Sequence, residues 1–350
     1  RKRADPQTAQ TPPSRDRSID VPLIGRIADI EFPEGPVARP DLPVAVVLDE
    51  FSRVSFQYEF AVTDVPARGW RPVLEAKPPR LLLVESAYRG HDGSWAGRVA
   101  RFGRPSQELT DVVSWCRDRG IPTVFWVKED PINHDWFSAS AGLFDWVLTV
   151  DSNMVGHYRR RLGHERVDVM QFAAQPVVHH PGPEDRVERV AFAGSYFAAK
   201  HEARREQMDV LLTAALPYGL DIFDRMDRPD DPRFGWPESL REHIRGTLTY
   251  AQTVEAYRRY AAFINVNTVT NSPTMCARRI YELLACGSQV VSGPSDALEG
   301  VPVLVASDRD TAGMQIEKAL SMGLNTTGQA WVESGHTMSH RVDRMLELIL

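Results

Sequence analysis

Short apolar runs alternate with longer mixed stretches along most of this chain from Val44 onward. Each run has the length and composition of a strand that is buried on both faces of a parallel sheet. Strands that alternate with helical stretches predict right-handed βαβ crossovers and a doubly wound sheet. The predicted strands of this part are residues 44–51, 80–86, 122–127, 145–150 and 167–172, and the clearest helices are residues 106–119 and 153–162.

The alternation is interrupted between Gln175 and Glu188, where prolines and charged residues predict an interdomain linker. A second unit then begins with a strand at residues 189–197, a Gly194–Ser195 turn and a helix from about His201. The predicted fold class is therefore α/β, with one Rossmann-like domain at residues 44–180 and another at residues 181–350. At 350 residues and 43% hydrophobic content, the chain is long enough to bury two such cores.

Residues 1–43 differ from the rest because they are rich in Pro, Arg and Asp and show no periodicity. A segment of this composition buries too little apolar surface to order itself. We expect a disordered linker that belongs to a longer polypeptide.

Composition and charge exclude several classes of protein. A net charge of −6 and a pI near 6.0 argue against nonspecific nucleic-acid binding. No apolar run has the length of a membrane span, and no signal peptide is visible, which favours a cytoplasmic protein. The three cysteines, Cys116, Cys276 and Cys286, fit neither a disulfide framework nor a zinc site, so we expect buried thiols in a reducing compartment.

The segment with the richest chemistry is residues 263–293, which predicts a strand, a polar turn, a helix from about Met275 to Ala285 and a second strand. Ser272 and Thr274 supply capping oxygens, and the free N–H groups of a helix start bind anions. Arg278 and Arg279 add cationic groups suited to phosphate. Glu282 lies two turns after Met275, roughly 10 Å along the same face. Diphosphate at the helix start and ribose at Glu282 would together match a nucleoside diphosphate.

A simpler interpretation of this segment is that Arg278 and Glu282 form an i,i+4 surface ion pair. Resemblance favours the functional interpretation. The stretch RRIYELLACGSQVVSG is similar to the "E…LACG.PVV" segment of glycosyltransferases with the GT-B fold, whose glutamate holds the donor ribose. Glu282 is the matching position. Retaining members usually carry a second acidic residue eight positions earlier, where this chain has Thr274.

Several further segments, in order, resemble the CgeB-like or spore maturation protein glycosyltransferases. They are LDEFS, VESAYRGHDGSW, GIPTVFWVKEDP, FAGSYF, DIFDR and INVNTVTNSPTMCARRIYELLACG. This resemblance implies a GT-B fold in which two Rossmann-like domains face each other across a cleft. The first domain would hold a hydroxyl-bearing acceptor and the second a nucleotide-sugar donor.

The resemblance also implies roles for residues of the second domain. Ser195, Lys200 and Arg204 would contact the diphosphate, with the Ser272 to Met275 amides behind it, and Tyr250 would lie near the base. Arg278 and Arg279 would neutralise the departing diphosphate. No Asp-x-Asp arrangement stands at a strand end, so neither a metal nor another cofactor is expected.

The acid/base group is expected at the strand exits of the first domain, because Glu282 is assigned to the ribose. His91 and Asp92, between two glycines, are the first candidates, and Glu129 and Asp130 come next. Asp92 and Asp130 could instead only cap or turn their loops. The predicted function is sugar transfer to a hydroxyl acceptor. The alternatives are a nucleotide-sugar epimerase or phosphorylase, and a non-catalytic nucleotide- or glycan-binding module.

Overall fold

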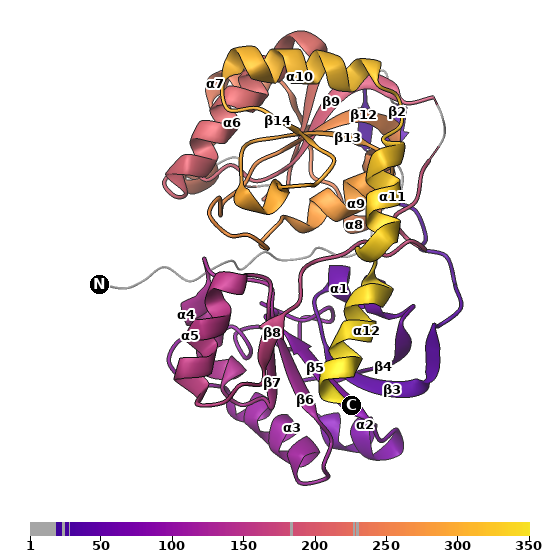
Figure 1. The fold of residues 1–350 in the computed structure, drawn as a ribbon, viewed down its shortest axis with the longest axis vertical. Helices are drawn as coiled ribbons and strands as arrows, with labels where there is room; N and C mark the ends of the chain where they lie inside the picture. The colour runs from indigo at the N-terminus through magenta and orange to yellow at the C-terminus, as the bar shows by residue number, and fades with distance from the viewer. Residues whose placement is uncertain (1–18, 23–24, 28, 183–184, 227, 229–230) are drawn as a thin grey trace.

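The computed structural model describes residues 19–22, 25–27, 29–182, 185–226, 228 and 231–350. Two six-stranded parallel sheets form the centres of two domains, which lie one above the other in Figure 1. The predicted α/β architecture of two Rossmann-like domains is confirmed. Each predicted strand of the first domain is present, together with an edge strand at Phe60–Asp64 that the apolar pattern did not predict.

The sheet of the N-terminal domain has the order β4-β3-β5-β6-β7-β8. Its strands are β3 (Arg39–Val47), β4 (Phe60–Asp64), β5 (Leu81–Glu85), β6 (Thr123–Val127), β7 (Trp146–Thr149) and β8 (Val167–Val169). The helices are α1 (Glu50–Phe56), α2 (Trp70–Ala76), α3 (Gln107–Arg117), α4 (His134–Ala141) and α5 (Ser152–Leu162). Since successive strand residues point to opposite faces, both faces of this sheet must be covered.

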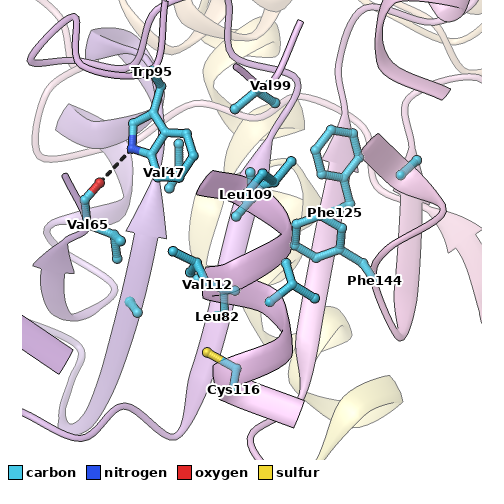
Figure 2. Packing of buried hydrophobic residues seen from close by; sticks show 14 of the residues in the cluster. Val47, Val65, Leu82, Trp95, Val99, Leu109, Val112, Cys116, Phe125 and Phe144 are labelled. Atoms are coloured by element: carbon cyan, nitrogen blue, oxygen red, sulfur yellow. Dashed lines mark hydrogen bonds between the residues drawn. The ribbon is translucent and has the colours of Figure 1, made fainter. Parts of the chain in front are cut away.

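One face of this sheet is covered by α2 to α5. Figure 2 shows α3 on the sheet, with Leu109, Val112 and Cys116 close to Leu82 of β5. The helix begins where predicted because the Ser106 hydroxyl accepts a hydrogen bond from the Leu109 N–H (3.2 Å). The indole N–H of Trp95, a buried side chain, donates to the Val65 carbonyl at 2.6 Å and ties the loop after β5 to this core.

The sheet of the C-terminal domain has the order β11-β10-β9-β12-β13-β14. Its strands are β9 (Val187–Gly194), β10 (Leu220–Asp224), β11 (Ile244–Gly246), β12 (Tyr260–Asn265), β13 (Gln289–Ser292) and β14 (Leu304–Val305). The helices of this half of the sequence are α6 (Glu202–Ala215), α7 (Glu238–Arg241), α8 (Tyr250–Arg259), α9 (Arg278–Ala285), α10 (Arg309–Ser321), α11 (Thr326–Gly335) and α12 (Met338–Ile349). Helices α6, α7 and α10 cover one face, and α8, α9 and α11 cover the other.

The last helix, α12, packs on the N-terminal domain, although we predicted residues 181–350 as one C-terminal unit. Met338, Val342 and Met345 are buried against the second face of the first sheet, next to Val46 and Trp126. In Figure 1, α11 and α12 run from the upper domain into the lower one. The sequence pattern could not show this, because an amphipathic helix does not indicate which sheet it covers.

Removing one buried side chain tests how much the packing of α12 contributes to the free energy of unfolding. Met345→Ala is expected to lower the free energy of unfolding by about 2–4 kcal/mol, because a buried side chain is lost and a cavity remains. Glu347→Ala on the exposed side of the same helix is the control, with an expected change within about 0.5 kcal/mol. Denaturant unfolding measures both, and equal values would show that α12 contributes little to the core.

The predicted disordered linker at residues 1–43 is wrong for its second half, while residues 1–18 lie outside the described part. Strands β1 (Ile19–Val21) and β2 (Gly25–Ile27) form an antiparallel hairpin, in which Val21 and Ile27 are buried against the C-terminal domain. Strand β3 begins at Arg39, where a salt bridge to Glu59 (2.9 Å) holds it. A few apolar residues between polar neighbours were enough to anchor the segment.

The three cysteines are buried and unpaired, as expected. In the part of the chain that the structure describes, no helix combines the length and the apolar character needed to cross a bilayer.

Candidate functional site

The carboxyl end of β9 is a topological switch point of the C-terminal sheet. From β9 the chain continues to β10 on one side, and the later strand β12 pairs on the other side. In open α/β sheets, ligands bind at such a point. Gly194 and Ser195 stand there, and a Cβ on Gly194 would lie 2.8 Å from the Phe192 ring and 3.4 Å from Arg279 Nη2. Only glycine leaves room for this close approach.

Three arginines surround this turn. Arg204 of α6 donates to the Ser195 carbonyl (3.3 Å) and to the Val266 carbonyl (3.2 Å). The backbone N–H of Arg225, an exposed residue just after β10, donates to the Gly194 carbonyl (3.2 Å). Arg279 lies on α9. Within the described residues, none of these three guanidinium groups has a carboxylate at ion-pair distance.

The positive charges at this turn, which have no carboxylate of the described residues at ion-pair distance, affect the pKa of one of the arginines. Burial, reinforced by the charges of Arg279 and Arg225, lowers the pKa of Arg204 to about 9. Arginines normally pair with carboxylates when they are buried, because an isolated charge is costly away from water. The cluster is therefore arranged for an anion.

Among the residues predicted for the donor site, four buried polar atoms have no hydrogen-bond partner in the described part of the chain. They are Ser195 Oγ, Arg204 Nε, Arg279 Nη1 and Glu282 Oε2. Such groups are rare in folded proteins, and each calls for an explanation such as a missing ligand. Three of the four are hydroxyl or guanidinium groups, which can donate to phosphate oxygens, and the fourth is an acceptor suited to a hydroxyl.

Glu282 is held by three side chains although it is almost completely buried. Its Oε1 accepts from the Tyr250 hydroxyl (3.0 Å) and lies 3.3 Å from Arg278 Nε and 3.5 Å from His179 Nε2. Arg278 in turn stands over the ring of Phe51, with 3.9 Å between its Cζ and the ring centre. Phe51 belongs to the N-terminal domain, so both domains contribute to this end of the site.

Of the residues predicted for the donor site, Tyr250, Arg278 and Glu282 thus lie together, and Ser195, Arg204 and Arg279 form a neighbouring group. Lys200 is different, because it is exposed before α6 and no recorded side-chain contact links it to either group. Its role in phosphate binding stays a prediction.

The predicted helix start at Met275 is wrong, because α9 begins three residues later at Arg278. The Ser272 hydroxyl accepts from the N–H groups of Thr274 (3.3 Å) and Met275 (3.0 Å), so these amides are not free for an anion. Ser272 also donates to Asp151 (2.6 Å), and Thr274 Oγ1 donates to the Val150 carbonyl (2.9 Å). Residues 272–275 therefore connect the two domains, and the polar turn was mistaken for a helix cap.

The N-terminal domain contributes a charged group at its own switch point, beside the ends of β3 and β5. Lys128 Nζ lies 2.8 Å from Glu85 and 3.1 Å from Asp49. Burial alone would raise the pKa of Asp49, but the Lys128 ammonium outweighs it and lowers this pKa. These residues stand at or just after the carboxyl ends of β3, β5 and β6, which are neighbours in the sheet, and this order brings the three side chains together.

His91 and Asp92, the first candidates for the base, lie in the loop after β5. Asp92 is exposed, and its carboxylate accepts from the Ser94 N–H (2.9 Å), which is the loop-capping geometry considered as the simpler alternative. His91 Nδ1 lies 3.7 Å from an oxygen of Asp64. Neither side chain has a recorded contact with the arginine cluster.

Glu129 and Asp130 have contrasting environments. Asp130 is fully buried, and its two oxygens are used by Thr149 (2.7 Å), His134 (3.1 Å) and Tyr158 (3.2 Å), so it cannot serve as a free base. Glu129 is only half-buried.

Glu129 has one carboxylate oxygen in use and one available. Oε2 accepts from Tyr88 (3.2 Å) and Asn133 (2.7 Å), whereas Oε1 accepts from none of the described residues. Desolvation lowers the pKa of the Arg225 guanidinium, and the charge of the Glu129 carboxylate opposes this shift, so the two groups are within electrostatic reach of each other.

Two residues of the site were not predicted. Arg225 follows the carboxyl end of β10, and its place at a strand exit was the signal that could have identified it. His179 lies in the segment between the domains, where nothing in the local pattern distinguishes it from the adjacent His180.

The neutral state of two histidines, the buried His179 and the half-buried His336, predicts how the free energy of unfolding depends on pH. Burial lowers the pKa of His179 from 6.5 to about 4, and burial with nearby Arg341 and His340 does the same for His336. Between these values the unfolded chain binds more protons, so stability falls as the pH drops from 6.5 towards 4. Denaturant unfolding at several pH values in this range gives the slope of the free energy of unfolding against pH. This slope is expected to be smaller in His336→Gln than in wild type by the equivalent of about one bound proton. An unchanged slope would contradict the prediction.

Comparison with known proteins identifies the class. Residues 185–347 match a family model described as "Glycosyl transferase-like". Sucrose-phosphate synthase from Thermosynechococcus elongatus has a similar structure, with a TM-score of 0.54 and 10% identity over 88% of this chain and 98% of that one. The chain therefore has the predicted GT-B fold, and the family match confirms the predicted class of enzyme, a glycosyltransferase.

Two further solved structures are similar and were determined in complex with UDP. T4 phage BGT, solved with UDP and Mn²⁺, has a TM-score of 0.55 and 10% identity over 88% of this chain and 99% of that one. HepE of Anabaena, solved with UDP, has a TM-score of 0.51 and 13% identity over 87% of this chain and 90% of that one. A search of curated proteins finds no sequence match.

Proposed function

We propose that this protein transfers a sugar from a nucleoside diphosphate sugar, with UDP as the first nucleotide to test, to a hydroxyl group of an acceptor. The observation that carries the proposal is the set of unpartnered polar atoms of Ser195, Arg204, Arg279 and Glu282, which match a diphosphate and a ribose hydroxyl. The two UDP complexes among the similar structures support the choice of nucleotide.

In this proposal Arg204, Arg225 and Arg279 bind the diphosphate. As the bond between the anomeric carbon and the phosphate oxygen breaks, its electron pair stays with the nucleotide. Fixed cations stabilise this developing charge without reorganisation, which is the largest contribution in many enzymes. The predicted independence from metal ions remains part of the proposal.

The acceptor hydroxyl attacks the anomeric carbon and must lose its proton. We assign this proton to Glu129, since its Oε1 is available and its charge acts on Arg225 of the other domain. Tyr88 and Asn133 orient the carboxylate through its other oxygen. His91 and Asp92 remain candidates of second rank, and the first domain is proposed to hold the acceptor.

Glu282→Gln tests the donor site. The substitution keeps the shape of the side chain and removes its charge, so UDP binding measured by calorimetry is expected to weaken by about 10- to 100-fold, the loss of a charged hydrogen bond. Glu317→Gln, on the distant helix α10, is the matched control. Equal affinities in wild type and Glu282→Gln would remove Glu282 from the site.

The same experiments separate the alternatives. A non-catalytic binding module would bind UDP-sugars without hydrolysing or transferring the sugar, and an epimerase would change the sugar while it stays on the nucleotide. Analysis of the products formed from a panel of UDP-, GDP-, dTDP- and ADP-sugars distinguishes these outcomes.

A further inference from the structure

The segment between the two domains carries one histidine that the proposed reaction does not use. The side chain of His179 is completely inaccessible, yet it lies within reach of the donor site of the other domain. Its immediate neighbour His180 is exposed and bonds to Arg258. A buried imidazole in a connecting segment needs a partner for each ring nitrogen.

The hydrogen bonds of His179 fix which ring nitrogen carries the proton. Its Nδ1 accepts from the Gln175 backbone N–H (3.0 Å), so in the neutral ring the proton is on Nε2. Nε2 lies 2.9 Å from the Tyr250 hydroxyl and donates to it. The Tyr250 hydroxyl in turn donates to Glu282 Oε1 (3.0 Å). Each hydrogen bond in this series thus runs in the same direction, with its donor on the side of Gln175 and its acceptor on the side of Glu282.

We propose that His179 is a positioning residue for the donor: it orients the Tyr250 hydroxyl, which holds Glu282 so that Oε2 is left to accept from the donor ribose. This inference rests on the proposed function, because it takes Glu282 as the ribose-binding group. Oε2 has no partner among the described residues, in keeping with this role. A tyrosine without His179 could rotate its hydroxyl proton away from the carboxylate.

The chain of hydrogen bonds continues into the N-terminal domain. The Gln175 side-chain amide donates to Glu59 Oε1 (2.8 Å) and to the Ser55 carbonyl (3.1 Å). Glu59 is paired with Arg39 at the start of β3. The orientation of Glu282 in one domain therefore depends on a network rooted in the other, and donor affinity depends on how the connecting segment is placed.

Packing alone is the competing explanation. Tyr250 also contacts Phe51 and Phe32, with ring centres 4.7 Å and 5.5 Å away, so its ring is held without His179. Packing fixes the position of the ring but not the direction of the hydroxyl hydrogen. A test must therefore remove the hydrogen bond and keep the volume.

Calorimetric titration with UDP of wild type, His179→Leu, His179→Gln and Tyr250→Phe provides this test. A glutamine amide reaches the place of Nε2 and can donate to Tyr250, whereas leucine cannot. We expect roughly tenfold weaker UDP binding in His179→Leu and Tyr250→Phe, the effect of one hydrogen bond to a charged acceptor. His179→Gln and the control His180→Leu are expected to bind UDP within about twofold of wild type. The double variant His179→Leu/Tyr250→Phe is expected to bind UDP no more weakly than either single variant, because both substitutions remove the same interaction with Glu282.

The outcomes are distinguishable. Unchanged UDP affinity in Tyr250→Phe, a variant that keeps the packed ring, overturns the inference even if His179→Leu does not fold. Equal losses in His179→Gln and His179→Leu overturn it as well, because that pattern is a packing defect. If the wild type binds no nucleoside diphosphate at all, the proposed function itself fails.

Discussion

Arg279→Met is expected to weaken UDP binding by about 10- to 100-fold and at the same time to stabilise the ligand-free protein. The loss of affinity follows from removing a charged donor to the diphosphate. The gain in stability follows because Arg279 faces Arg204 and Arg225 with no carboxylate at ion-pair distance in the described residues, and burial lowers its pKa. A methionine in its place packs on Phe192 without a charge.

Lys200→Met is the comparison for this prediction, since it removes the same charge from an exposed side chain of the same domain that was also predicted to contact the diphosphate. Its effect on UDP affinity is expected to be less than about threefold once exposed charges are screened by salt. Calorimetry and thermal unfolding of the ligand-free variants measure both quantities. A larger loss in Lys200→Met than in Arg279→Met would restore the phosphate role predicted for Lys200 and remove it from Arg279.

Glu129→Gln is expected to lower turnover by roughly 100-fold or more while leaving UDP affinity within about twofold of wild type. Glu129 takes the proton of the acceptor hydroxyl only in the transition state. Removing this base therefore lowers turnover and leaves binding of the donor unchanged. The side-chain amide oxygen of glutamine can still accept a hydrogen bond from Tyr88 or Asn133, but the amide cannot take up the proton of the acceptor hydroxyl. Steady-state rates with the best donor of the panel measure the effect.

Asp92→Asn is the comparison for this second prediction. Its carboxylate caps the loop through the Ser94 N–H, a bond that asparagine retains, so turnover is expected within about threefold of wild type. A 100-fold loss in Asp92→Asn with an active Glu129→Gln would reverse the ranking of the two carboxylates. Less than tenfold loss in both would place the base elsewhere, including on the donor phosphate.

The two-sheet fold could be predicted from the sequence because buried parallel strands are continuous apolar runs, which Leu81–Glu85 and Thr123–Val127 illustrate. The edge strand β4 was missed because only its first residue is buried, and half-exposed strands lack that signal. The paired strands β1 and β2 and the position of α12 were missed for another reason. Both depend on which distant surface a segment covers, and local periodicity contains no such information.

The donor site could be predicted in part for a similar reason. Ser195, Arg279 and Glu282 stand at strand exits or on one helix, where local geometry already brings chemistry together. Thr274 shows the limit, because its polar turn satisfies helix-cap rules and yet bonds to Val150 of the other domain. His179 could not be predicted, since its role depends on a tyrosine 71 positions away in the sequence.

The placement of α12 has a consequence for biosynthesis. The ribosome makes the whole C-terminal sheet before it makes residues 338–349, so the face of the N-terminal sheet that carries Val46 and Trp126 lacks the cover that α12 provides throughout that time. Of these two domains, the one that is synthesised first is thus completed after the other. A nascent chain stalled before Met338 would present this apolar face to chaperones, and its release from them would await the synthesis of α12.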